Sequence, residues 1–122
     1  MTIRGEEAAL KVDLGGGPTT EEIWGRLPFE GPANLWGDEI YFEIPVSVGP
    51  EDEARETVEV GDVCYWPQGE ALCIFFGPTP ASTDEKPKAA SPVTVVGRIS
   101  EGLDDVERIE PGETLRVEGA EE

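Results

Sequence analysis

The stretch GDVCYWPQGEALCIFFGPTP, residues 61–80, decides the fold, because two apolar runs flank a group of turn-forming residues. Pro67 and Gly69 lie in that turn, and both residue types favour a chain reversal. Pro67 has no amide hydrogen, so a strict two-residue turn at 68–69 would lack one hydrogen bond of the strand ladder. We therefore predict a three-residue loop in which Gly69 adopts the left-handed conformation of a β-bulge.

This loop length sets the pairing of the two strands and separates the two cysteines of the chain. The predicted cross-strand pairs are Trp66 with Glu70, Cys64 with Leu72, and Val63 with Cys73. Cys64 and Cys73 then point to opposite faces of the sheet, so we expect no disulfide. Two cysteines without any histidine also fall short of the four ligands of a structural zinc site, and we expect no metal or cofactor. We interpret both cysteines as small core residues rather than nucleophiles, since no histidine is present as a base.

Outside the hairpin, frequent turn residues divide the chain into short segments. The 15 glycines and 11 prolines give the spacing of an all-β barrel or sandwich. Apolar alternation and β-forming composition predict strands at 9–14, 38–48, 56–66, 70–77, 93–99 and 113–118. A capping box of Thr19 and Glu22 predicts the start of a short helix that Pro28 stops. A second short helix is predicted over 101–109, after a polar loop at 78–92.

Length and charge limit the kind of protein further. The 122 residues predict one domain, residues 1–122, with an acidic tail over about 118–122. Acidic residues number 27 and basic residues 9, so the formal net charge is −18, which argues against a nucleic-acid partner. An acid-rich surface is typical of proteins from salt-loving organisms, where screening weakens the repulsion among carboxylates. An ordinary acidic protein with an acidic tail is the alternative.

The chain shows no membrane or export signal. No apolar run approaches the roughly 20 residues that a membrane-spanning helix needs. The N-terminal segment MTIRGEEAAL lacks the apolar stretch of a signal peptide. We expect a soluble, cytoplasmic protein that does not associate with a membrane.

The hairpin and its neighbours resemble the cyclophilin-like family of small prokaryotic proteins. The resemblance is carried by GDVCYWPQGEALCIFFGPTPAS, with LPF…NLWGDEIYFEIP before it and SPVTVVGRI after it, and it covers about residues 12–117. More distantly, the hairpin and the segment GRISEGLDDVERIE are similar to parts of the true cyclophilins, which are peptidyl-prolyl isomerases. This resemblance implies an all-β fold, a closed eight-stranded antiparallel barrel with a short helix over each open end.

The catalytic residues of the isomerases do not carry over to this sequence. Phe76 matches the phenylalanine that lines the proline pocket of cyclophilins, but Phe42 or Glu43 stands at the position of the catalytic arginine. Ile74 or Cys73 replaces the glutamine before the phenylalanine pair, and the chain has no histidine. The resemblance therefore implies a non-catalytic domain that binds a small ligand or a peptide. A divergent peptidyl-prolyl isomerase is the alternative.

One face of the hairpin is the candidate ligand-binding surface. The predicted register gathers on it Trp66, Leu72, Ile74 and Phe76, where cyclophilins have their substrate groove. Such a patch could accept an apolar ligand or a proline-containing peptide, or it could be core packed under a helix or under the loop at 78–92. Pro78 and Pro80 follow the strand and give either a rigid loop beside a ligand-binding groove or a plain chain reversal.

The carboxylates of the strand predicted at 38–48 are a second candidate. Glu39 and Glu43 lie on one face by the two-residue period of a strand, and such a pair could perform acid–base chemistry or hold a hard cation. With 27 acidic residues, however, such pairs also arise by chance. If the chain is an enzyme, the candidate catalytic residues are Tyr41 and Glu43, the latter at the position of the lost arginine.

Overall fold

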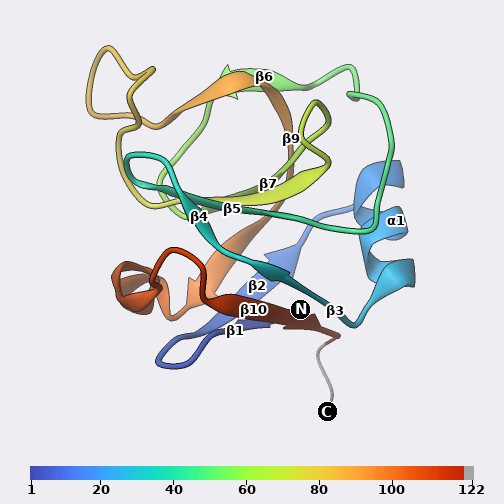
Figure 1. Ribbon diagram of the computed structural model, residues 1–122. Helices are drawn as coiled ribbons and strands as arrows, with labels where there is room; N and C mark the ends of the chain where they lie inside the picture. The colour runs from blue at the N-terminus through green and yellow to red at the C-terminus, as the bar shows by residue number, and fades with distance from the viewer. Residues whose placement is uncertain (120–122) are drawn as a thin grey trace.

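The computed structural model describes residues 1–119 and is mainly β (Figure 1). The strands are β1 (Thr2–Arg4), β2 (Ala9–Leu14), β3 (Phe29–Pro32), β4 (Asn34–Leu35), β5 (Glu39–Glu43), β6 (Arg55–Thr57), β7 (Asp62–Trp66), β8 (Ala71–Phe75), β9 (Lys88–Glu101) and β10 (Thr114–Glu118). The helices are α1 (Pro18–Arg26) and the 3₁₀-helix η1 (Leu103–Arg108). Most of the acidic tail predicted over 118–122 lies outside the described residues.

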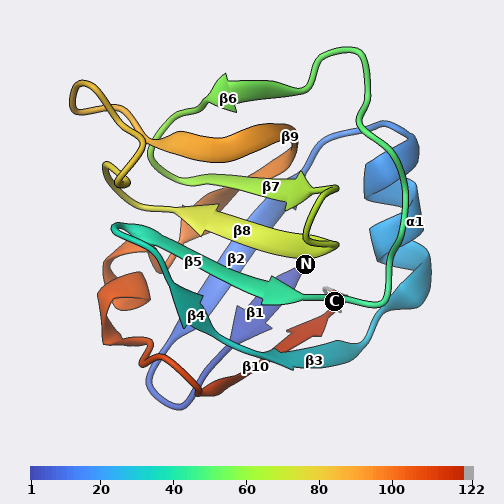
Figure 2. The same ribbon diagram turned by 45° about the horizontal axis from the view of Figure 1, so that its top comes forward.

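All strand pairs are antiparallel, and they form one strongly curved sheet (Figures 1 and 2). Nine of its ten strands follow the order β3-β10-β1-β2-β9-β7-β8-β5-β4, and the tenth, β6, pairs with β9 beside this path. The path has two ends, at β3 and β4, which are joined in the chain by Ala33 alone. The predicted antiparallel β class is confirmed, whereas the predicted closed eight-stranded barrel is not.

The two short helices lie on opposite sides of the sheet, α1 on the right and η1 on the left in Figures 1 and 2. The capping box predicted for α1 is wrong, because the helix begins at Pro18 and Gly17 at its N-cap makes no side-chain capping bond. Instead the amide of Thr19 donates to the Glu51 carboxylate at 2.9 Å. An acid from a distant loop thus occupies the positive end of the helix dipole, and hydrogen bonding to Thr19 lowers the pKa of Glu51. In the described residues no helix is long and apolar enough to cross a membrane.

The β7–β8 hairpin differs from its prediction by one residue. Its loop has four residues, Pro67–Glu70, and the left-handed conformation falls on Glu70, with φ 50°, rather than on Gly69. The amide of Glu70 closes the turn onto the carbonyl of Pro67 at 3.3 Å. Gly69 is needed for space, since a Cβ there would lie 2.4 Å from Cε3 of Trp66. In a four-residue loop Pro67 also lies outside the strand ladder, so its missing amide hydrogen leaves no ladder hydrogen bond unmade. Pro67 is therefore compatible with both loop lengths and does not favour the three-residue loop.

This change of one residue reverses the predicted facing of side chains. Trp66 pairs with Ala71 and Cys64 pairs directly with Cys73, so both thiols lie on the same face of the sheet. The predicted separation of the cysteines is wrong, although both are free in the structure.

Two further segments depart from their predictions. The strand predicted over 56–66 is broken by a turn in which the amide of Asp62 donates to the carbonyl of Glu59 at 3.0 Å. Its first part becomes β6 and its second part becomes β7. The loop predicted over 78–92 ends early, because Lys88 already begins the long strand β9.

The curved sheet has two separate apolar clusters. The larger cluster fills the inside of the sheet and includes Ile40, Phe42, Tyr65, Leu72 and Ile74. The smaller one lies on the outer face of β7 and β8 and consists of Val58, Cys64, Cys73, Phe75, Ala89 and Val93. β6 and the first half of β9 pair with each other and cover this outer face (Figure 2). The apolar character of both hairpin faces therefore reflects two cores rather than one.

Candidate functional site

A pocket of about 180 Å³ opens at the edge of the smaller cluster. We call it the outer-face pocket, and its lining comprises Trp36, Glu39, Tyr41, Trp66, Ala89, Ala90 and Val93. These residues come from the β4–β5 turn and from β5, β7 and β9. Elements far apart in the sequence thus build one site.

The β4–β5 turn places an indole beside a carboxyl group. Trp36 and Glu39 exchange two backbone hydrogen bonds, of 2.9 and 3.1 Å, across a two-residue turn whose Gly37 has a left-handed φ of 59°. Residues paired in this way point to the same face of a sheet. The next pair along this face is Asn34 with Tyr41, so one tight turn delivers three of the pocket's polar and aromatic groups.

Two small side chains of β8 lie next to the aromatic residues of the pocket. Ala71 and Cys73 lie on the outer face of β8, opposite Trp66 of β7 and Tyr41 of β5 respectively. Their small size lets the flanking rings meet above them, with centroids 5.9 Å apart and planes at 84°. The indole Nε1 of Trp66 donates to Oγ of Ser91 at 2.6 Å. This bond fixes the orientation of the larger wall.

Glu39 is the unusual group in this pocket. Its side chain is 5% exposed, and burial raises the pKa of its carboxyl to about 7, although a hydrogen bond with the thiol of Cys73 opposes the shift. A thiol is a weak donor, so it compensates little of the charge. Within residues 1–119 no basic side chain forms an ion pair with Glu39.

Asp62, the other buried charged residue in the described part of the chain, is treated differently. It pairs with the Arg98 guanidinium at 2.5 Å and accepts the amide of Glu59 at 2.9 Å. Buried charges are normally compensated in this way. Glu39 therefore stands out as an uncompensated carboxyl that lines an aromatic pocket.

The thiols beneath the pocket are not reactive groups. Burial raises the pKa of both Cys64 and Cys73 well above the usual range, and the charge of Glu39 raises both further. Thiols of this kind stay protonated near neutral pH and behave as small apolar side chains. Both belong to the smaller apolar cluster beside the pocket.

The GPTP run, residues 77–80, does not line the pocket but is hydrogen-bonded to two of the segments that do. The Pro78 carbonyl accepts the amide of Asp38 at 3.0 Å, and the buried Thr79 hydroxyl donates to the carbonyl of Lys88. The run thereby joins the β4–β5 turn to the start of β9. Pro78 and Pro80 are themselves exposed.

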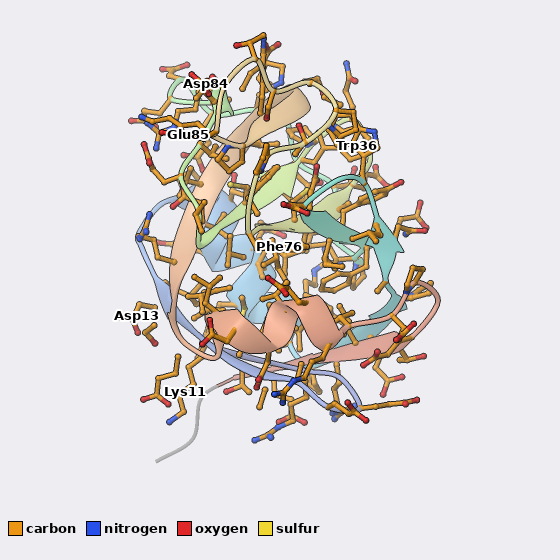
Figure 3. All side chains as sticks on the ribbon, turned by 90° about the vertical axis from the view of Figure 1, so that its left-hand side faces the viewer. Lys11, Asp13, Trp36, Phe76, Asp84 and Glu85 are labelled. Atoms are coloured by element: carbon orange, nitrogen blue, oxygen red, sulfur yellow. The ribbon has the colours of Figure 1, made fainter. Side chains whose placement is uncertain are left out.

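The predicted binding face is split by the observed pairing. Trp66 lies on the outer face in the pocket, whereas Ile74 pairs with Val63 on the inner face and has no exposed surface. Phe76 is half-buried against the larger cluster (Figure 3). The prediction that Trp66, Ile74 and Phe76 share one face is wrong, for the reason given by the hairpin loop.

The two carboxylates of the predicted pair, Glu39 and Glu43, lie on the same face of the strand but differ in burial. Glu39 and Glu43 pair with Phe75 and Ala71 on the outer face, as the two-residue period indicates. Glu43 is exposed and outside the lining, while Glu39 and Tyr41 line the pocket.

The sequence analysis did not single out Trp36 or the pocket-lining residues of β9, which are Ala89, Ala90 and Val93. The pattern DEIYFEIP placed Glu39 and Tyr41 on the same face, which was the available signal. The other side of the pocket is lined by Ala89, Ala90 and Val93 at the start of β9, and the polar composition of residues 88–92 did not reveal this part of the strand. Trp36 is partly exposed and lies near the margin of the molecule in Figure 3.

Comparisons with known proteins agree with this architecture. Residues 1–118 match the family described as cyclophilin-like. The chain belongs to the cyclophilin-like family. The solution structure of a hypothetical protein from Archaeoglobus fulgidus is 43% identical, with a TM-score of 0.85, over 98% of this chain and 92% of that one. Among curated proteins no match is found. The family resemblance expected from the hairpin is confirmed.

Proposed function

We propose that this cyclophilin-like chain is a small-ligand-binding domain whose site is the outer-face pocket. The observation that carries the proposal is the buried, uncompensated carboxyl of Glu39 beneath Trp36, Tyr41 and Trp66. Binding sites typically combine an apolar, aromatic lining with a few placed polar groups. The burial of a carboxyl without a basic partner opposes folding, and a role in binding accounts for its presence.

The size of the pocket favours a small molecule over a peptide. A cavity of about 150 Å³ accommodates benzene, and this pocket measures about 180 Å³. We propose binding without isomerase catalysis, in keeping with the residues at the position of the catalytic arginine. Of these, Phe42 is fully buried in the larger cluster, and Glu43 carries the opposite charge to arginine.

The three tryptophans provide a direct test with an internal control. Trp36 and Trp66 line the pocket, whereas the half-exposed Trp24 belongs to α1. Their indole N–H signals would be assigned by NMR with single tryptophan-to-phenylalanine variants. A library of fragments near the size of benzene would then be titrated. We expect saturable shifts of the Trp36 and Trp66 signals while the Trp24 signal stays in place.

Two outcomes would contradict the proposal. Fragments that shift only Trp24 would place the binding site beside α1, and the absence of any saturable shift would remove the binding function. A proline-isomerisation assay on a short peptide, at low and high salt, tests the alternative. Acceleration that is lost in Phe76→Ala would favour the divergent isomerase instead.

A further inference from the structure

We propose that the ligand of the outer-face pocket is a small alkylated ammonium ion, held between the aromatic walls with Glu39 as its counter-charge. This inference rests on the proposed function and names the chemical class of ligand. Three properties of the pocket support it: the charge of its polar group, the nature of its walls and the small number of its acceptors.

The charge of the pocket selects a cation. Glu39 is the charged residue of the lining, and no arginine or lysine lines the pocket in the described part of the chain. An anionic ligand would be repelled by Glu39 and by the net charge of −18. A neutral ligand would leave the carboxylate uncompensated in an apolar site. A cation would give Glu39 the positive counter-charge that Arg98 gives to Asp62, the other buried acid.

The walls select an organic cation over a metal ion. Rings of tryptophan and tyrosine attract cations through the negative charge of their faces, and quaternary ammonium ions are bound by such aromatic cages. Trp66 and Tyr41 stand nearly perpendicular, so their two rings do not stack face to face. A hard metal ion instead takes six to eight oxygen ligands or an octahedral shell. Within residues 1–119 no group of three or more metal-ligating side chains is found.

The small number of hydrogen-bond acceptors in the pocket favours an alkylated ammonium ion over a primary ammonium ion. A primary ammonium ion has three N–H donors, and each needs an acceptor when it leaves water. In the described lining, Glu39 carries the one carboxyl group, and the other polar side-chain atoms are the two indole donors and the Tyr41 hydroxyl. Replacing N–H groups by methyl groups lowers the number of acceptors that the ligand needs from Glu39 and Tyr41 and adds apolar surface for the rings. The volume of about 180 Å³ suits an ion of the size of tetramethylammonium.

The test compares choline with its neutral analogue, in which a quaternary carbon replaces the nitrogen. Both are titrated into the whole chain at constant ionic strength, and the Trp36 and Trp66 indole signals are followed by NMR. We expect choline to bind about tenfold more tightly than the neutral analogue, because only choline gains the cation–π and carboxylate attractions. Sodium chloride at equal concentration should leave both signals unshifted.

Two variants and a control identify the groups responsible. Glu39→Gln should weaken choline binding about tenfold or more and leave the neutral analogue unaffected. Trp36→Leu keeps an apolar wall at the exposed margin and should likewise weaken only choline, which retains a test if Glu39→Gln folds poorly. Glu107→Gln removes one exposed charge from η1 and should change neither affinity.

The outcomes separate this inference from the proposed function. Equal affinity for both probes, unchanged in Glu39→Gln, would overturn the cation inference and leave a small-ligand pocket. Equal weakening in Glu39→Gln and Glu107→Gln would overturn it as well, because choline would then respond to net charge alone. Failure of both probes and of all fragments to shift Trp36 and Trp66 would overturn both proposals.

Discussion

The two faces of the β7–β8 hairpin are built from neighbouring residues of the same strands but differ in packing. The inner face carries Val63, Tyr65, Leu72 and Ile74, all without exposed surface. Even its one polar group is satisfied, since the Tyr65 hydroxyl donates to the Val46 carbonyl at 2.7 Å and accepts the Val48 amide at 3.3 Å. The outer face ends in a pocket with an uncompensated acid.

The difference comes from the sizes of the side chains on β8. Large residues, Leu72 and Ile74, fill the inside of the sheet, whereas the outer face carries the small residues Ala71 and Cys73 before it reaches the buried Phe75. Hydrophobicity alone does not separate these faces, because both are apolar. A closely packed face stabilises the fold, and a face with small residues between aromatic walls leaves room for a ligand.

Truncating one residue on each face gives the largest expected contrast. Leu72→Ala should lower the free energy of unfolding by about 2 to 5 kcal/mol, because it opens a cavity in the packed inner core. Cys73→Ala, at the adjacent position on the outer face, should cost about 1 kcal/mol, because it removes one small group beside an existing pocket. Denaturant unfolding of both variants measures the contrast. Equal losses would mean that the outer face is packed as tightly as the inner one.

The pH dependence of stability isolates the uncompensated acid. The pKa of Glu39 is about 7 in the folded chain and has its ordinary value of 4.5 when unfolded. Between these values the unfolded chain has released the proton that the folded chain retains, so the free energy of unfolding falls as pH rises. The total loss is about 3 kcal/mol and is complete somewhat above pH 7.

Glu39→Gln should abolish this loss. Its stability relative to the natural chain should therefore increase between pH 4.5 and pH 8, measured by denaturant unfolding at high salt. Glu107→Gln is the control for the removal of one charge. A difference between Glu39→Gln and the natural chain that does not vary with pH would show that Glu39 titrates normally.

Loss of the hydrogen bond that orients Trp66 gives the smallest expected effect. Ser91→Ala removes the acceptor of the indole N–H and should cost about 1 kcal/mol of stability. Its NMR signature is faster exchange of the Trp66 indole proton with solvent. Ser100→Ala is a matched control on the same strand, since the exposed Ser100 makes a longer bond of 3.3 Å to the Lys11 carbonyl. We expect it to change stability by less than about 0.5 kcal/mol. Equal effects of the two variants would show that Ser91 does not anchor the wall.

The sequence predicted those elements whose signals are local. The alternation of residues 9–14 gave β2 with its observed bounds, and the hairpin motif indicated both the antiparallel class and the family. Turn geometry was harder, because Pro67 is equally compatible with three- and four-residue loops. The observed loop packs Gly69 against Trp66, three residues earlier, and this contact could not be read from the residue types alone.

The site was predicted only in part, for the same reason. Trp66, predicted as a ligand-binding residue, and Tyr41, predicted as a candidate catalytic residue, both line the pocket, and Glu39 was placed on the observed face of its strand. Its exceptional character arises from its burial in a pocket that it shares with Ala89 and Val93, which lie some fifty residues later in the chain. Periodicity within one strand cannot reveal what covers that strand. The acid in the pocket and the exposed acid at position 43 therefore looked equivalent.

The four-residue loop at Pro67–Glu70 also restricts how this hairpin can vary in length. An insertion or deletion of one residue that shifted the pairing register would exchange the two faces of β8 relative to β7, because side chains alternate between the faces with every residue. Ala71 and Cys73 would then point into the core, and Leu72 and Ile74 would lie on the outer face beside the pocket. Insertions or deletions here preserve both faces when they come in even numbers, or when they stay confined to the loop. The parity of one short turn thus separates the part of this protein that folds from the part available to bind.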